Sequence, residues 1–369
     1  MGYNHLRDKI GHAGRDLTSK RGERMQDDYF TLMQTLAPDL AQEIERRALV
    51  LERIGALQPV GRRLLANRLN LPEREVRTVA ALLKEHGLVS LDAAGMSLTP
   101  QADAILPMAR LLSRDLRGLT SLETALSEAL GVPKVCVVAG DADRDDHVLS
   151  EVGRSAALRL RSFLQSGSTL AVTGGSTIHA VAFALPKGTP MNVMVVPARG
   201  GIGRALETQA NTVASEIAKR LGGHHRLMHL PDRLDEQALQ EMRKLREIDE
   251  TLDLLERADV VLHGIGRADD MAQKRQLPAA LFSEVMRKGA VAEAYGCYFD
   301  RRGRLVYAAS TVAHDLGALK PECALIAVAA GARKAEAIRA VMKNRPHVLL
   351  VTDEGAARAI LDGPSENRL

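Results

Sequence analysis

Hydrophobic residues in the first third of the chain recur with the spacing of α-helices. Between residues 31 and 117 an apolar residue returns every three or four positions, which places these side chains on one face of a helix. In residues 40–57 this face consists of Leu40, Ile44, Ala48, Leu51 and Ile54. A short strand-like stretch interrupts the helical pattern between residues 88 and 98. The pattern therefore predicts a helical module with one small β-hairpin.

Beyond residue 131 short apolar runs alternate with amphipathic helices, and glycine-rich turns join them. Continuous runs of four to six apolar residues are typical of parallel strands that helices cover on both faces. The expected strands are residues 135–139, 170–173, 192–196, 226–230, 259–263, 324–328 and 347–351. The fold class is thus α/β, with a doubly wound, Rossmann-like sheet after the helical module. A helix over residues 106–130 is expected at the boundary between the helical module and the α/β domain.

Residues 59–98 have the order of elements of a winged helix-turn-helix. A short helix follows Pro59, a tight turn at Pro72 starts a second helix that ends near Gly87, and a hairpin comes next. The short helix is expected to bury Leu64, Leu65 and Leu69. This order of elements is a more specific signal than charge, because the net charge of +3 over residues 60–78 also fits an ordinary solvated surface.

Basic residues on the two helices are candidates for DNA contacts. The second helix carries Arg74, Arg77 and Thr78 away from its apolar face, where they can reach phosphates and base edges in a major groove. Arg62 and Arg63, at the start of the short helix, are expected to contact phosphates. The sequence thus predicts double-stranded DNA as a partner.

Length and composition limit the other possibilities. The 369 residues suggest two domains, here a DNA-binding domain over 31–115 and an effector-binding domain over 116–369, after a polar tail over 1–30. The formal net charge of +4 suits an anionic partner, whereas 3% aromatic residues and the absence of Trp argue against stacking on single strands. The sequence lacks a long apolar run and a secretory signal, so no membrane association and a cytoplasmic location are expected. Three cysteines in or beside apolar runs are expected to be reduced core thiols.

The strongest motif of the second domain lies in residues 170–179, where a strand runs into two glycines and two hydroxyl residues that open a helix. The free N–H groups of a helix start favour an anion, and glycines let a ligand approach the backbone. The candidate residues are Gly174, Gly175, Ser176 and Thr177. A plain strand–turn–helix with a capping serine would give the same pattern. The motif differs from the ATP and dinucleotide fingerprints, so no cofactor is expected, and three cysteines without a CxxC pair predict no metal site.

Three further glycine-rich loops follow strands and bring cations or amides to the same sheet edge. Arginine offers a planar donor fork to phosphate, and carboxylates and amides can accept or donate hydrogen bonds to sugar hydroxyls. The candidates are Arg199, Gln209, Lys274, Arg275, Glu293 and Lys334. Each is a weak signal alone, but together they predict a sugar phosphate or similar anionic polyol as the ligand.

Taken together, these motifs resemble bacterial transcriptional repressors of the SorC type, most closely those that control glycolytic genes in Gram-positive bacteria. The resemblance covers about residues 31–361 and is carried by residues 59–63, 95–99, 173–177, 199–201, 263–266, 292–296 and 351–357. It implies an operator upstream of glycolytic genes, fructose 1,6-bisphosphate as the inducer, and a homo-oligomer (dimer or tetramer) joined through the second domain. It also maps the family's ligand contacts onto the ten loop residues above. Ser176 replaces a threonine, and the choice between Lys274 and Arg275 stays open.

Two alternatives remain. A SorC-type regulator could sense a different sugar phosphate. The second domain also resembles sugar-phosphate isomerases and glucosamine-6-phosphate deaminases, in which a Gly-Ile-Gly loop precedes an Asp-Gly-His run. Here Gly264-Ile-Gly266 is followed by Arg267-Ala-Asp-Asp270, without a histidine for proton transfer. The protein is therefore expected not to be an enzyme, and His263 is expected to be a structural histidine.

Overall fold

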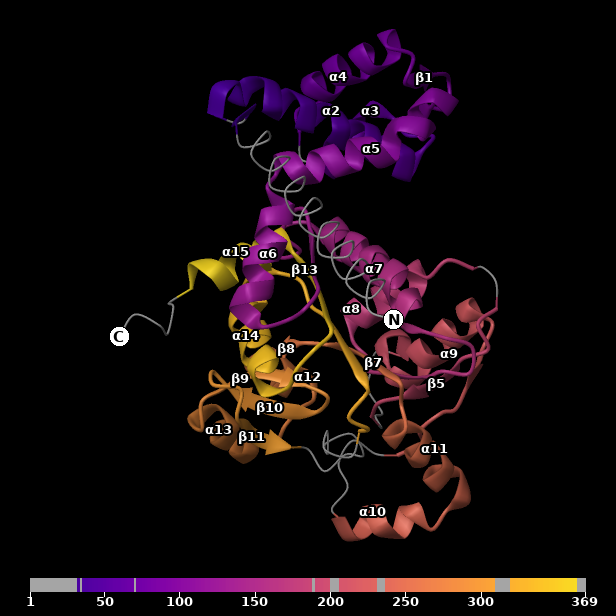
Figure 1. Ribbon diagram of the computed structural model, residues 1–369, viewed down its shortest axis with the longest axis vertical. Helices are drawn as coiled ribbons and strands as arrows, with labels where there is room; N and C mark the ends of the chain where they lie inside the picture. The colour runs from indigo at the N-terminus through magenta and orange to yellow at the C-terminus, as the bar shows by residue number, and fades with distance from the viewer. Residues whose placement is uncertain are drawn as a thin grey trace, which may run out of the picture. The chain divides into compact units, whose positions relative to one another are not determined.

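The computed structural model describes residues 32–33, 35–69, 71–187, 190–199, 206–230, 236–308 and 319–363. The chain divides into two compact units between Ser121 and Leu122, each with its own hydrophobic core (Figure 1). The expected tail over residues 1–30 lies outside the described residues, as do residues 200–201 of the second glycine-rich loop. Within the described ranges every helix is too short or too polar to cross a lipid bilayer.

The first unit is a winged helix-turn-helix, as the sequence predicted. Its elements are α2 (Pro38–Leu57), α3 (Arg62–Leu69), α4 (Glu73–Glu85), β1 (Val89–Leu91), β2 (Met96–Leu98) and α5 (Pro100–Leu116). Helix α5 packs along α2, and one core joins the helices to the hairpin through Ile54, Leu65, Val76, Leu83 and Met96. The hairpin is held next to its turn, because Val60 and Met96 exchange two backbone hydrogen bonds of 3.0 and 2.9 Å.

Some details of this unit differ from the expectation. Leu40 and Leu64 point outward, with 55% and 50% of their surface exposed, because the inward positions beside them are taken by Ala41 in α2 and by Leu65 and Ala66 in α3. The single helix expected over residues 106–130 is two helices, α5 and α6 (Leu119–Leu130). Gly118 divides them, and its φ of +65° lies in the left-handed region that glycine adopts most readily.

The second unit contains a seven-stranded parallel sheet in the order β3-β13-β12-β7-β4-β5-β6. The strands are β3 (Val135–Val138), β4 (Thr169–Val172), β5 (Met194–Pro197), β6 (His224–His225), β7 (Val260–Gly264), β12 (Ala324–Val328) and β13 (Leu349–Asp353). Helices α7 (Asp146–Leu160), α8 (Ser176–Ala184) and α9 (Ala210–Leu221) pack side by side, and α14 (Ala335–Asn344) and α15 (Glu354–Asp362) cover the other face (Figure 1). This is the doubly wound α/β architecture that the apolar runs predicted.

The remaining elements of this unit surround the sheet. They are η1 (Arg161–Phe163), η2 (Leu206–Thr208), α10 (Glu236–Arg243), α11 (Arg246–Glu256), α12 (Ala268–Lys274), α13 (Ala279–Arg287) and η3 (Ala332–Lys334). A second, antiparallel sheet has the order β11-β10-β9-β8. Its strands are β8 (Gly266–Arg267), β9 (Ala290–Ala294), β10 (Cys297–Asp300) and β11 (Leu305–Ala308). This sheet was not predicted, because β9 and β10 are almost entirely buried and lack the alternation of polar and apolar residues by which antiparallel strands are usually recognised.

The two lateral strands of the parallel sheet are β3 and β6. On β3, the Val137 amide donates to Glu123 Oε1 of α6 at 2.7 Å. The strand expected over residues 226–230 is absent, and β6 ends at His225. Directly after it, the side chain of Asn211 accepts from the Met228 amide at 2.9 Å and donates to its carbonyl at 3.1 Å. An amide side chain thus occupies the backbone groups that strand pairing would have used.

Candidate functional site

The exposed face of α4 carries the predicted DNA contacts. Burial of Val76, Val79, Ala80 and Leu83 fixes the rotation of this helix against the core. Arg74, Arg77 and Thr78 are consequently exposed on its other side. The Thr78 hydroxyl donates to the Arg74 carbonyl at 3.0 Å. A contact from Thr78 to DNA would have to use the same hydroxyl group.

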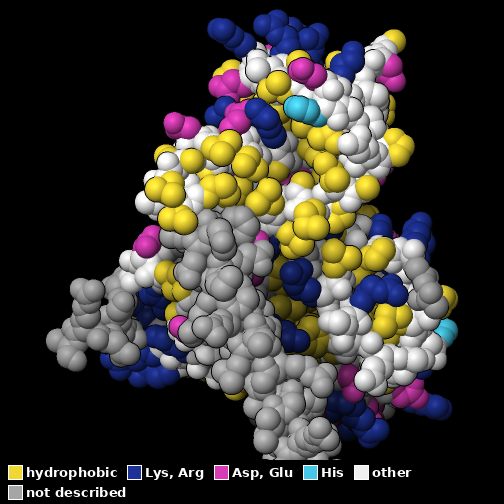
Figure 2. All heavy atoms as spheres, turned by 45° about the horizontal axis from the view of Figure 1, so that its top comes forward, with side chains coloured by type: hydrophobic (Ala, Val, Ile, Leu, Met, Phe, Trp, Pro, Cys, Tyr) yellow, Lys and Arg dark blue, Asp and Glu magenta, His cyan; other side chains and the backbone are white. Residues whose placement is uncertain are grey.

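Helix α3 adds Arg62 and Arg63, which are exposed in its first turn. They belong to the same small unit as α4, and the two helices pack on each other. In Figure 2, Lys and Arg side chains gather at the top of the view, on this unit. The arrangement suits a helix in a groove of DNA with basic residues beside it.

In the second unit, the anion-binding candidates start at the carboxyl end of β4. Gly174 lies so close to η2 that an added Cβ would be 2.4 Å from the Thr208 carbonyl oxygen. Gly175 caps α8 with a φ of +110°, and its amide donates to the same carbonyl at 2.8 Å. The loop is thereby fixed next to Gln209, the residue that caps α9.

The hydroxyl residues of this loop have different environments. Ser176, the first residue of α8, is exposed, whereas Thr177 is 5% exposed. A ligand at the helix start can therefore reach the Ser176 hydroxyl, while Thr177 faces the interior. The free amides of the first helical turn and the helix dipole favour an anion here.

Two predicted arginines converge on one buried carboxylate. Glu293 lies on β9, opposite Gly266 of β8, and its side chain is only 5% exposed. Its Oε1 accepts from Arg275 Nη2 at 2.7 Å and from the Gly296 amide at 2.7 Å, and Arg199 Nη1 lies 3.8 Å away. The structure thus brings Arg199, Arg275 and Glu293 together from three separate segments of the chain.

The two predicted lysines, Lys274 and Lys334, interact electrostatically. Lys334 ends η3 and caps α14, and Lys274 is the exposed last residue of α12. Burial lowers the pKa of Lys334, and the positive charge of Lys274 lowers it further. Lys274 and Arg275 are adjacent in sequence, but Lys274 interacts with Lys334, whereas Arg275 binds Glu293.

Three aspartates near Lys334 were missed in the sequence. Asp141 and Asp143 lie in the loop after β3, and Asp353 is the last residue of β13. All three accept hydrogen bonds from the turn that precedes Lys334. The acidic run 141–146 directly after an apolar strand was the signal that could have found two of them.

The expectation that His263 is structural agrees with its contacts. It is fully buried at the end of β7, and its Nε2 lies 2.9 Å from Nε2 of His347. The Tyr295 hydroxyl is 3.3 Å from the same atom of His347. Burial lowers the pKa of both histidines, so they are neutral at physiological pH.

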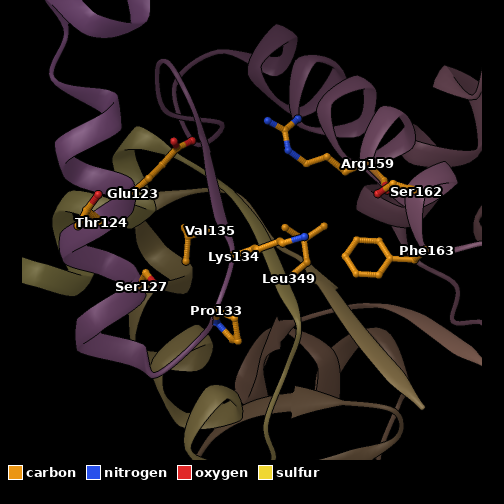
Figure 3. A pocket seen from close by; sticks show the side chains of 10 residues that line it. All are labelled: Glu123, Thr124, Ser127, Pro133, Lys134, Val135, Arg159, Ser162, Phe163 and Leu349. Atoms are coloured by element: carbon orange, nitrogen blue, oxygen red, sulfur yellow. The ribbon is translucent and has the colours of Figure 1, made fainter. Parts of the chain in front are cut away.

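A cavity of about 460 Å³ lies at the opposite, amino-terminal edge of the sheet (Figure 3). It is lined by Glu123, Thr124, Ser127, Pro133, Lys134, Val135, Arg159, Ser162, Phe163 and Leu349. Several of its polar side chains make contacts within the protein. Glu123 binds the Val137 amide, Arg159 donates to the Ser155 hydroxyl at 2.8 Å, and Lys134 lies over the Phe163 ring. None of the predicted ligand-site residues lines this cavity.

Comparisons with known proteins agree with this division of the chain. A sugar-binding domain family matches residues 114–362, and the CggR N-terminal DNA binding domain family matches residues 44–111. The chain is 38% identical over 332 residues to the central glycolytic genes regulator of Priestia megaterium, covering 89% of this chain and 97% of that protein. It is 36% identical to the protein of the same name from Bacillus subtilis, covering 88% and 96%.

Solved structures show the same fold. A SorC family transcriptional regulator from Enterococcus faecalis is 36% identical, with a TM-score of 0.61 over 65% of this chain and 99% of that one. The full-length sorbitol operon regulator of Klebsiella pneumoniae has a TM-score of 0.61 at 19% identity, over 82% of this chain and 94% of that one. The similarity to the Klebsiella protein extends through both units and supports the fold alone.

Proposed function

Because the chain belongs to the SorC family of transcriptional regulators, with a DNA-binding domain and a sugar-binding domain, we propose that it represses glycolytic genes and that fructose 1,6-bisphosphate is its inducer. Relatives that are named regulators of central glycolytic genes support the choice of target. In this proposal the winged helix holds operator DNA, and the ligand at the carboxyl edge of the sheet weakens that hold.

The convergence of Arg199 and Arg275 on Glu293 is the observation that carries the choice of ligand. A buried carboxylate keeps both guanidinium groups oriented, so that a phosphate bound to them would meet preformed donors. Lys274 and Lys334 form a second cationic group. Two cationic groups at one sheet edge suit a ligand with two phosphates, and hydroxyls between them could be bound by Gln209.

Calorimetric titration with fructose 1,6-bisphosphate and fructose 6-phosphate tests this proposal. We expect the bisphosphate to bind at least about tenfold more tightly, since one additional charge-assisted contact contributes roughly 1.5–3 kcal/mol. Gel shifts with operator DNA should then show release by the bisphosphate at lower concentrations. Equal affinity for both sugars would remove the second phosphate site and favour a regulator of another sugar phosphate.

The contacts of the Gly-Ile-Gly loop favour binding over catalysis. Arg267 forms two hydrogen bonds with Asp269, at 3.0 and 2.5 Å, and lies 3.7 Å from Asp270. The carboxylates that follow this loop are thus engaged in ion pairs, and His263 is buried. We propose that the protein does not isomerise or deaminate its ligand, and incubation with fructose 6-phosphate or glucosamine 6-phosphate should yield no product.

Oligomerisation is also part of the proposal. Helix-turn-helix proteins bind two-fold operators as dimers. Helix α5 exposes Ile105, Met108 and Leu111 at helical spacing, a pattern that often marks a contact between proteins. Sedimentation of the full chain should show a dimer or tetramer, and a monomer both with and without operator DNA would contradict this.

A further inference from the structure

Three consecutive backbone amides, in the turn before α14, each donate to a carboxylate from a different side chain. The donors are the amides of Gly331, Ala332 and Arg333, and their acceptors are in turn Asp353 Oδ2 at 2.8 Å, Asp141 Oδ1 at 3.2 Å and Asp143 Oδ2 at 2.7 Å. Amides in such a turn are the groups that normally bind an external anion. Here the protein's own carboxylates occupy them.

The next residue after these amides is Lys334. A phosphate at this end of the ligand therefore finds the lysine side chain and no vacant amide in the turn. We propose that Asp141, Asp143 and Asp353 are positioning residues, which hold this turn as a clamp and so present Lys334 to the second phosphate of the ligand. The inference rests on the proposed function and adds the means by which this lysine is placed.

The fit of the carboxylates shows how closely the turn is held. Gly331 has a φ of +105°, and a Cβ added to it would lie 2.7 Å from Asp143 Oδ1, so a glycine is needed for this contact. Asp353 is fully buried, and its carboxylate also accepts from the Ala142 amide at 2.7 Å and the Ala356 amide at 2.9 Å. One side chain thus joins the loops after β3 and β12 to the start of α15.

Two of these carboxylates, those of Asp143 and Asp353, also act on the charge of Lys334. Burial and Lys274 lower the pKa of Lys334, whereas the negative charges of Asp143, Asp353 and Asp270 act in the opposite direction. A lysine that binds phosphate must keep its proton, because the ammonium form supplies the charge. Geometry and charge therefore point to the same role for the clamp.

A double-mutant cycle on the full chain tests whether Asp143 acts through Lys334. The proteins are the wild type, Asp143→Ala, Lys334→Ala and the double variant, each titrated with fructose 1,6-bisphosphate. We expect Lys334→Ala to weaken binding about tenfold or more and Asp143→Ala about threefold or more. In the Lys334→Ala background, Asp143→Ala should have little further effect. A purely structural role of Asp143 would instead give the same loss in both backgrounds, and that result would overturn the inference.

Two controls and a second measurement complete the test. Asp143→Asn keeps an oxygen acceptor for the Arg333 amide and should restore most of the affinity, while Asp146→Ala, at an exposed position of the first turn of α7, should bind as the wild type does. Hydrogen exchange without ligand should show the Arg333 amide protected in the wild type and rapidly exchanging in Asp143→Ala. Unchanged protection overturns the clamp itself. A wild type that binds no sugar phosphate contradicts the proposed function, and with it the role given to Lys334.

Discussion

Acid should destabilise the second unit through its two buried histidines. His347 is 3% exposed, and its Nδ1 lies 2.7 Å from the Arg345 carbonyl oxygen, so this nitrogen carries the proton. Nε2 of His347 lies 2.9 Å from Nε2 of His263 and 3.3 Å from the Tyr295 hydroxyl, and Nδ1 of His263 lies 3.2 Å from the Gly264 carbonyl oxygen. Burial lowers the pKa of His347 from 6.5 to about 4, and it holds that of His263 well below 6.5. Both rings are therefore neutral in the folded protein.

The size of the effect follows from the pKa of His347. Because the folded state binds this proton less readily than the unfolded chain, the stability that neutral His347 provides is complete above about pH 6.5 and is lost as the pH falls toward 4. A depression from 6.5 to about 4 corresponds to about 3 kcal/mol at most, and to about 2 kcal/mol at pH 5. His263 changes stability in the same direction.

Urea unfolding followed by circular dichroism at pH 7.5, 6 and 5 measures this loss. In His347→Asn the decrease in unfolding free energy between pH 7.5 and pH 5 should be smaller by about 2 kcal/mol than in the wild type. His225→Asn removes an exposed histidine and should keep the full decrease. Titrating groups that His347 does not contact, among them Asp353, whose pKa burial raises, change equally in each protein and cancel in the difference. If His347→Asn lost as much unfolding free energy between pH 7.5 and pH 5 as the wild type does, the reasoning would be refuted.

Other substitutions test the two binding surfaces. Arg77→Ala should weaken operator binding by about 1–3 kcal/mol if this side chain contacts a guanine, which gel shifts can measure; unchanged affinity would remove α4 as the recognition helix. Arg62→Ala should lower the affinity for all DNA sequences alike. It should also reduce the slope of log affinity against log salt concentration by about one phosphate contact, and an unchanged slope would place Arg62 away from DNA. Arg199→Ala should weaken fructose 1,6-bisphosphate binding about ten- to a hundredfold in calorimetry and leave operator binding intact. Wild-type affinity in this variant would place Arg199 outside the ligand site.

Much of the fold could be predicted because its hydrophobic periods are unambiguous. The core face of α4 is regular, and six of the seven parallel strands coincide with continuous apolar runs. The errors have local physical causes. Leu64 was expected inside because it is apolar, although Ala66 fills the inward position. The run 226–230 has the composition of a strand, but the Asn211 side chain binds Met228 in place of a neighbouring strand.

The candidate site was less predictable, because its contacts depend on how distant segments are placed. The glycines of the α8 loop are recognisable, since only a glycine fits beside Thr208 or adopts the φ of Gly175. The pairing of Arg275 with Glu293 depends on an antiparallel sheet that the sequence pattern did not reveal. Asp353 reads as an ordinary helix cap in the sequence, and its bonds to two other loops become evident only when the strands are assembled.

The two lateral strands of the parallel sheet also limit how copies of this protein can associate. On β3 the Val137 amide is already bound by Glu123, and next to β6 the amide and carbonyl of Met228 are bound by Asn211. A strand from another chain would need these same groups to add itself to the sheet. At these two points the backbone groups are not available to a strand of a neighbouring copy, so these points of the parallel sheet do not join one copy to another. The number of strands in the parallel sheet is then set by a single chain, however many chains bind to the DNA together.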